Sequence, residues 1–160
     1  MNNLETLYHR VIANSNSEDI KIITKFLKNI EKKQHGEFGT YLSASLDMRR
    51  ELRENTCLVT IPNTKAIHNN IAMPHGGILA VLMDTAMGVL ANSKCPTGFG
   101  AVTTSLTIHY LAVATDDQLS AESRIVRQGR HTMVLEADII EPGGKHIATA
   151  TGAFFIVSKG

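Results

Sequence analysis

The segment 73–91, MPHGGILAVLMDTAMGVLA, holds a single carboxylate, Asp84, in a run that is otherwise mostly apolar or small. An acid in the middle of a buried helix either accepts hydrogen bonds as a structural group or acts as a general base or a nucleophile. Gly76 and Gly77 stand at the expected start of the same helix, where unpaired N–H groups and the positive end of the helix dipole lie. Glycine there lets a carbonyl group approach, so these amides could donate to an oxyanion. Together the two features favour chemistry at a carbonyl carbon, with a tight turn and a structural acid as the alternatives.

The composition predicts one compact domain and argues against several classes of protein. The 160 residues are 43% hydrophobic, and 16 basic against 15 acidic side chains give a formal net charge of +1. No basic stripe points to a nucleic-acid partner. The longest apolar run, 76–83, is too short to span a bilayer and the N-terminus has no signal-peptide core, so we expect no membrane partner and a cytoplasmic location.

Motifs for metals and cofactors do not occur in the sequence. Cys57 and Cys95 lie far apart and form no CxxC pair, which fits a reducing compartment. The seven histidines show no HxH or HExxH spacing, and His68 and His75 flank a proline-containing loop without acidic partners. There is no GxGxxG or GxxxxGK segment for a nucleotide cofactor, and no GxSxG elbow for a serine nucleophile.

Hydrophobic periodicity predicts the elements that must position these groups. An amphipathic helix is expected over 17–33, capped by Ser17 and with acidic residues in its first turn, and a shorter helix over 4–13. The pattern then changes to strands, and the segment MRREL is expected to be a charged turn between the first two. The remaining expected elements are strands over 41–48 and 56–61, a helix over 76–91, and strands over 101–111, 118–127, 131–140 and 145–157.

This order predicts an α+β fold in which one antiparallel sheet wraps around a central helix. The helix over 76–91 should be about 24 Å long and is apolar on nearly every face. A single sheet covers only one side of it, so we expect a second copy of the chain to cover the rest, in a dimer or a higher oligomer. Asp84 should lie about 12 Å from the first turn of its own helix, so one carbonyl group can meet both only between two subunits.

The stretch HNNIAMPHGGILAVLMDTAMG resembles the motif of the hotdog-fold thioesterases of the phenylacetate-degradation type. Asn69 stands six residues before His75, and the acid Asp84 stands nine residues after it, as in that family. The later stretch VTTSLTIHYLAVA resembles the next strand of the family, with Thr103 and Tyr110 at its hydroxyl-bearing positions.

The resemblance implies an acyl-CoA thioesterase that works as a homodimer or homotetramer with active sites between subunits. It covers roughly residues 40–157, and it implies a hotdog thioesterase domain over 39–160 behind an N-terminal helical extension over 1–38. No cofactor is expected. In the family the first glycine of the pair is the usual oxyanion donor, which favours Gly76 over Gly77.

The resemblance also implies roles for the other candidate residues. Asp84 of one subunit would act on a carbonyl group held by the partner subunit, and burial would strengthen its carboxylate as a base. Two mechanisms stay open: Asp84 as a general base for water, or Asp84 as the nucleophile. Asn69 can hold the attacking water or the thioester, Thr103 can position water, and His75 is either structural or an acid–base catalyst. The expected substrate-binding residues are Met73, Met83 and Met87 in an apolar acyl pocket, and Arg127, Gly129 and Arg130 at a turn near the phosphates of the coenzyme.

Two other functions stay open at this point. The same fold can bind acyl-CoA or acyl carriers without hydrolysis, as a regulatory module, although the helix over 17–33 does not resemble a DNA-binding segment. A hotdog hydratase or dehydratase would need a histidine that faces an acid in the site, and His75 is the only candidate. Arg127 and Arg130 have a structural alternative too, as solvent-exposed residues of a hairpin turn without a ligand.

Overall fold

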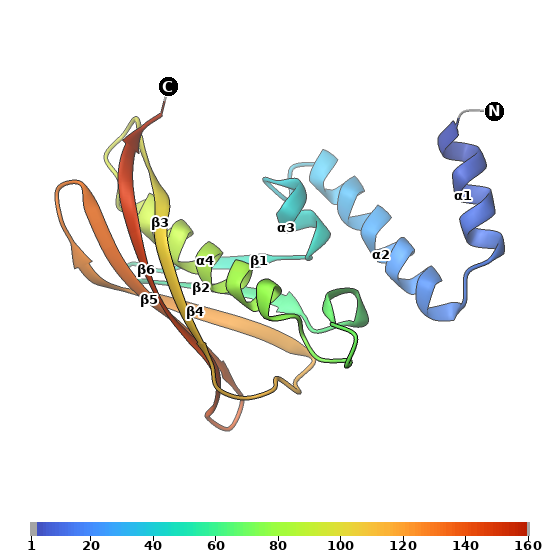
Figure 1. Ribbon diagram of the computed structural model, residues 1–160. Coiled ribbons are helices and arrows are strands. Elements are labelled where there is room, and N and C mark those ends of the chain that lie inside the picture. Colours follow the sequence, from blue (N-terminus) through green and yellow to red (C-terminus); the bar gives the residue numbers. More distant parts are fainter. Residues whose placement is uncertain (1–2, 160) are drawn as a thin grey trace. The chain divides into compact units, whose positions relative to one another are not determined.

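The computed structural model describes residues 3–159, and the contacts of the chain fall into two compact units (Figure 1). One unit is Met1–Asp47 and the other is Met48–Gly160. The first unit is helical, and the second holds the whole sheet together with its central helix. The boundary expected from the sequence lies after residue 38, and the contacts group residues 39–47 with the helical unit.

The helical unit contains α1 (Asn3–Ala13), α2 (Ser17–Gln34) and α3 (Tyr41–Ser45). The helix expected over 17–33 is confirmed, but its N-cap is Asn16 rather than Ser17. The Asn16 side chain accepts hydrogen bonds from the N–H groups of Glu18 and Asp19, and the Asp19 carboxylate accepts one from the Asn16 N–H. This capping box satisfies more of the free amides than a single serine would.

Residues 41–45 form a helix, so the strand expected over 41–48 is wrong. Thr40 caps this helix, because its side chain accepts from the Ser43 N–H while the Ser43 hydroxyl accepts from the Thr40 N–H. The segment MRREL, expected to be a turn, supplies the edge strand β1 (Arg49–Leu52) instead. All four residues of β1 are exposed, and charged side chains on an edge strand hide the apolar alternation that marks a strand in sequence.

The second unit is a six-stranded antiparallel sheet that curves around one face of α4 (Gly76–Ser93) (Figure 1). Its strands are β1, β2 (Thr56–Pro62), β3 (Phe99–Tyr110), β4 (Gln118–Gln128), β5 (Thr132–Glu141) and β6 (Lys145–Ser158). The strand order is β1-β2-β4-β5-β6-β3, so β1 and β3 are the edges of the sheet. The expected α+β fold is confirmed, and β2 to β6 begin and end within two residues of the predicted bounds.

Helix α4 has one covered face and one open face. The buried side chains pack against the inner face of the sheet, and they are Leu79, Leu82, Met83, Ala86, Met87, Leu90 and Ala91. The open face carries Asp84, Thr85, Gly88, Val89 and Asn92, so a single copy does not cover the helix all round. With a mean hydropathy of 1.3 over 18 residues, α4 is long and apolar enough to cross a membrane by length and composition alone. Packing against the sheet accounts for the apolar character of its covered face.

The connection from β3 to β4, residues 111–117, is tied to β5 by a buried carboxylate. Glu141 accepts hydrogen bonds from the N–H groups of Thr115 and Asp116, the latter at 2.8 Å, and pairs with Lys145 at 3.4 Å. Burial raises the pKa of Glu141, but these N–H groups and the Lys145 ammonium outweigh burial and hold the pKa below its ordinary value of 4.5. The clamp fixes the chain just beyond the end of β3.

Candidate active site

The start of α4 presents one free amide. His75 is the N-cap of the helix, and its ring Nδ1 accepts a hydrogen bond from the Gly77 N–H at 2.9 Å. The Gly76 N–H meets no acceptor among residues 3–159, because the first amides of a helix have no intrahelical partner. Of the two amides considered from the sequence, Gly76 is therefore the one that can bind an oxygen atom without losing an existing contact.

Tyr110, the last residue of β3, lies across the first turn of α4. Its hydroxyl donates a hydrogen bond to the Gly76 carbonyl at 2.9 Å. A Cβ atom added to Gly76 would lie 3.3 Å from Cζ and 3.4 Å from Oη of Tyr110. Even a methyl group at Gly76 would therefore push the tyrosine ring by a few tenths of an ångström, so glycine allows the close approach seen here.

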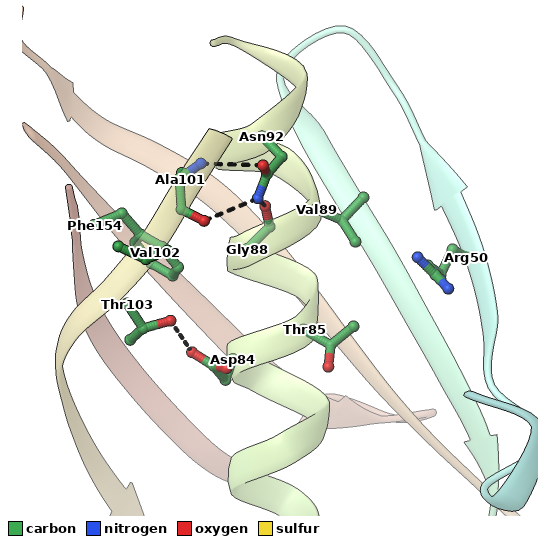
Figure 2. Close-up of a pocket in the computed structure, with 10 residues that line it drawn as sticks. All are labelled: Arg50, Asp84, Thr85, Gly88, Val89, Asn92, Ala101, Val102, Thr103 and Phe154. Carbon is green, nitrogen blue, oxygen red and sulfur yellow. Dashed lines mark hydrogen bonds between the residues drawn. The ribbon is translucent and has the colours of Figure 1, made fainter. Parts of the chain in front are cut away.

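Asp84 lies on the open face of α4, a little over two turns beyond Gly76. The Thr103 hydroxyl, on β3, donates a hydrogen bond to Asp84 Oδ1 at 2.8 Å (Figure 2). In a single copy Asp84 is half-buried and faces a pocket. Thr103 orients one carboxylate oxygen, and Oδ2 meets no donor within the described part of the chain, so it is available to a water molecule.

The pocket beside Asp84 has a volume of about 550 Å³ and lies over the open face of α4 (Figure 2). Its lining residues are Arg50, Asp84, Thr85, Gly88, Val89, Asn92, Ala101, Val102, Thr103 and Phe154. The Asn92 side chain joins α4 to β3, since it accepts from the Ala101 N–H and donates to the Ala101 carbonyl. A volume of this size suits a small organic group. Across residues 3–159, no cluster of three or more His, Cys, Asp or Glu side chains could hold a metal ion.

Asn69 organises the loop between β2 and α4, which also contains a short 3-10 helix, η1 (Lys65–Ile67). Its Oδ1 accepts hydrogen bonds from the N–H groups of Ile71 and Met73, at 3.0 and 3.1 Å. The side-chain oxygen is thus used by the loop, whereas Nδ2 has no acceptor among the residues described. Asn69 can therefore donate to a water molecule or to a carbonyl oxygen, but its oxygen has no lone pair left for a water proton.

The three methionines expected in the acyl pocket do not line it. Met83 and Met87 are fully buried, and the sulfur of Met87 lies 3.1 Å from the position of a Cβ added to Gly152 on β6. Both point toward the sheet because they lie on the covered face of α4, opposite the pocket. Met73 is half-buried in the loop before α4 and lies outside the pocket as well.

Arg127, Gly129 and Arg130 lie at the turn between β4 and β5. Both arginines are exposed, and none of the three residues lines the pocket. The Gly129 N–H donates to the Thr132 carbonyl at 2.8 Å, which closes the turn. Contact of this turn with the coenzyme stays a prediction.

Arg50 and Asn92 line the pocket, although neither is expected there from the sequence. Arg50 stands in the segment expected to be a turn, and Asn92 stands just beyond the expected end of the helix at 91. A correct strand assignment for 49–52 would have placed Arg50 on one side of the sheet, because alternate residues of a strand face opposite sides.

Known proteins resemble this chain over the same region. Residues 73–148 match the Thioesterase superfamily model. The acyl-coenzyme A thioesterase PaaI of Escherichia coli K12 is 32% identical over 100 residues, which span 62% of this chain and 69% of that protein. The crystal structure of the BH2602 protein from Bacillus halodurans with CoA is similar over 95% of this chain and 99% of that chain, with a TM-score of 0.88 and 32% identity. The structure of the E. coli PaaI protein from the phenylacetic acid degradation operon is similar over 84% and 95% of the two chains, with a TM-score of 0.69 and 25% identity.

The family match begins at Met73 and therefore includes the free amide of Gly76, the open face of α4 and Thr103. The fold of the second unit, one antiparallel sheet around α4, is the fold of these structural relatives. The chain thus belongs to the thioesterase superfamily, as a hotdog thioesterase of the PaaI type.

Proposed function

We propose that this enzyme hydrolyses acyl-CoA thioesters in sites formed between two copies of the chain. The observation that carries the proposal is the pairing of Thr103 with the Asp84 carboxylate on the open face of α4, at 2.8 Å. The free Gly76 amide of the same helix is about 12 Å away along its axis, too far for one carbonyl group to contact both. Two helices from two subunits bring one Asp84 and one Gly76 together.

The chemistry follows from these two groups. In the general-base route, Asp84 Oδ2 takes a proton from water as the water oxygen bonds to the carbonyl carbon. The oxyanion accepts the N–H of the partner subunit's Gly76. The carbon–sulfur bond then breaks, the sulfur receives the proton from Asp84, and the products are the free acid and CoA.

A nucleophilic route uses the same atoms. Asp84 would attack the carbonyl carbon, expel the thiolate and form a mixed anhydride, which water then hydrolyses. A single turnover in ¹⁸O-labelled water distinguishes the routes. Label in the Asp84 carboxylate supports the anhydride, because only water that attacks the Asp84 carbonyl of an anhydride places oxygen there.

The comparisons support the substrate class. PaaI of E. coli is named an acyl-coenzyme A thioesterase, and the BH2602 structure contains CoA. The acyl group would lie in the pocket over α4, whose apolar lining includes Val89, Val102 and Phe154. As part of the same proposal, we place the enzyme in the cytoplasm, where Cys57 and Cys95 would stay reduced.

The alternative functions receive less support from the contacts. A hydratase or dehydratase would need His75 as its acid or base, but Nδ1 already accepts the Gly77 N–H and the ring holds the start of α4. A module that binds acyl-CoA without hydrolysis does not require the hydrogen bond by which the Thr103 hydroxyl orients the Asp84 carboxylate. Both alternatives are tested by the experiment below.

Release of free thiol from a panel of short, medium and aryl acyl-CoAs tests hydrolysis directly. Asp84→Asn should lower kcat by about 100-fold or more, because it removes the base or nucleophile and keeps the shape of the side chain. Asp117→Asn is the matched control, since this exposed acid lies outside the pocket and should leave kcat unchanged. Full activity of Asp84→Asn would return Asp84 to a structural role.

Mixing two inactive variants tests the shared site. A mixed dimer of Asp84→Asn and Gly76→Ala subunits holds one site with both defects and one site with neither. Random exchange makes half of the dimers mixed, so the mixture should regain about a quarter of the wild-type activity. If each site lay within one subunit, mixing would restore nothing.

A further inference from the structure

Arg50 is a charged residue on the inner side of the sheet. In the β1–β2 pair it lies directly opposite Val59, and residues that face each other across antiparallel strands project to the same side. Val59 is fully buried toward α4, as is Cys57 on the same strand. Burial raises the pKa of the Cys57 thiol and the Arg50 charge acts in the opposite direction, which agrees with a guanidinium near this buried row.

The Arg50 guanidinium has no carboxylate partner among the residues described by the structure. Other arginines near the sheet do: Arg53 contacts Glu51 and Glu122, and Arg124 likewise bridges two carboxylates on its neighbouring strand. Arg50 instead lines the pocket that also holds Asp84 (Figure 2). An arginine fork that faces a pocket without a protein partner can bind a planar anion with two hydrogen bonds.

Arg50 and Asp84 lie on the two sides of the open face of α4, with Thr85 and Val89 between them (Figure 2). Hydrolysis requires the thioester to lie at Asp84. An acyl group that extends from Asp84 across this face would place its far end at Arg50. The lining near the crossing is small or apolar, which suits a short methylene chain. We therefore propose that Arg50 selects acyl groups that carry a carboxylate at their far end, that is, dicarboxylic acyl-CoAs; this inference rests on the proposed function.

The phosphates of the coenzyme are the other possible source of an anion. They lie at the far end of the pantetheine arm from the sulfur, whereas Arg50 lines the same pocket as Asp84, the residue proposed to act at the thioester carbonyl. An acyl carboxylate at the end of a short chain fits this proximity better. Because Arg50 is exposed, a neutral acyl chain leaves its guanidinium hydrated, and the selectivity comes from the charged hydrogen bonds that only the carboxylate adds.

The test compares acyl groups of equal carbon number with and without the second carboxylate. The pairs are succinyl-CoA with butyryl-CoA, glutaryl-CoA with valeryl-CoA, and adipyl-CoA with hexanoyl-CoA. At least one pair should show kcat/KM about 10- to 100-fold higher for the dicarboxylic member, the range of a charge-assisted hydrogen bond at a partly exposed site. Arg50→Leu should abolish this ratio, mainly through a raised KM for the dicarboxylic member.

Arg49→Leu is the matched control, because Arg49 lies on the same strand opposite Thr60 and projects to the other side of the sheet. It should leave the ratio as in the wild type. The proposal is overturned if the wild type favours neutral acyl groups in every pair or if Arg50→Leu keeps the ratio. It is also overturned if Arg50→Leu raises KM equally for all acyl-CoAs and weakens inhibition by free CoA, since Arg50 would then bind the coenzyme.

A binding measurement keeps this test separate from the test of hydrolysis. Non-hydrolysable thioether analogues of glutaryl-CoA and valeryl-CoA can be titrated into the Asp84→Asn variant by calorimetry. Tighter binding of the glutaryl analogue, lost in Asp84→Asn/Arg50→Leu, supports the selectivity whether or not thiol is released from any substrate. Equal affinity for the two analogues contradicts it.

Discussion

Replacement of Gly76 by alanine should separate catalysis from folding. Gly76 is the first residue of α4 and its φ is not positive, so alanine fits the backbone. The added Cβ would lie 3.3 Å from Cζ of Tyr110, and this ring, about half exposed, must move by a few tenths of an ångström. The displacement weakens the hydrogen bond from the Tyr110 hydroxyl to the Gly76 carbonyl, which lowers the free energy of unfolding by about 1 kcal/mol. The better helix propensity of alanine offsets up to about 1 kcal/mol of this loss.

The free energy of unfolding should therefore change by less than about 1 kcal/mol, which shifts Tm by no more than about 4 °C in a chain of this size. The activity should fall far more. A methyl group beside the free amide blocks the approach of a carbonyl oxygen, and loss of one oxyanion donor lowers kcat by about 100- to 1,000-fold. Thermal denaturation and thiol release, measured on the same preparation, check the two numbers together.

Gly77→Ala is the natural comparison, because its Cβ would lie 3.1 Å from Nδ1 of His75. That variant should lose the N-cap bond and about 0.5 to 2 kcal/mol of stability, with a smaller effect on kcat than Gly76→Ala. A Gly76→Ala enzyme with kcat within about threefold of the wild type would refute the assignment of this amide as the oxyanion donor. A larger loss in Gly77→Ala would assign the donor to Gly77 instead.

Two further variants test the contacts around the site. Thr103→Val should lower kcat about tenfold with Tm unchanged, because it removes the hydrogen bond that orients Asp84, and Thr103→Ser should restore the rate in steady-state assays. Glu141→Gln should destabilise the fold by about 1 to 3 kcal/mol at pH 7, since the neutral amide loses the charge that strengthens the hydrogen bonds from the Thr115 and Asp116 N–H groups and loses the ion pair with Lys145. Because the pKa of Glu141 is lowered in the folded protein, the stability that its carboxylate contributes is present above pH 4.5 and is lost as pH falls through the folded pKa. The difference in Tm between wild type and Glu141→Gln should therefore shrink in acid. An equal difference at pH 7 and pH 3 would contradict this.

The fold could be predicted largely because its long strands end at clear turns. The hairpin between β5 and β6 contains Gly143 and Gly144, both with positive φ, and a sequence search for strand ends finds such glycines directly. The segment 41–52 carries no comparable signal. Its helix is only five residues long and depends on the Thr40 cap, and three of the four residues of its strand are charged.

The site could be predicted as residue types but not as contacts. The sequence identifies His75, Gly76 and Gly77 together, yet only the structure reveals that the histidine ring occupies one of the two amides. The methionines illustrate a second limit. A helix that is apolar on nearly every face has no periodicity that tells which side meets the sheet, so Met83 and Met87 could not be assigned to the core rather than to the pocket.

One irregularity in β3 explains how a single strand contacts both of the residues of α4 that we propose to be catalytic, Asp84 and Gly76. Thr103 and Tyr110 are seven residues apart, and residues at an odd spacing in a regular strand face opposite sides of the sheet. Both nevertheless reach α4, where Thr103 donates to Asp84 and Tyr110 donates to the Gly76 carbonyl. The pairing of β3 with β6 shifts register between Thr103 and Ser105, and this extra residue returns the two hydroxyl groups to the same side. Because β3 is also an edge of the sheet, a second chain that paired along it would shift Thr103 and Tyr110 together, and with them the Asp84 carboxylate and the Gly76 carbonyl, so assembly would be coupled to the geometry of the proposed site through one strand.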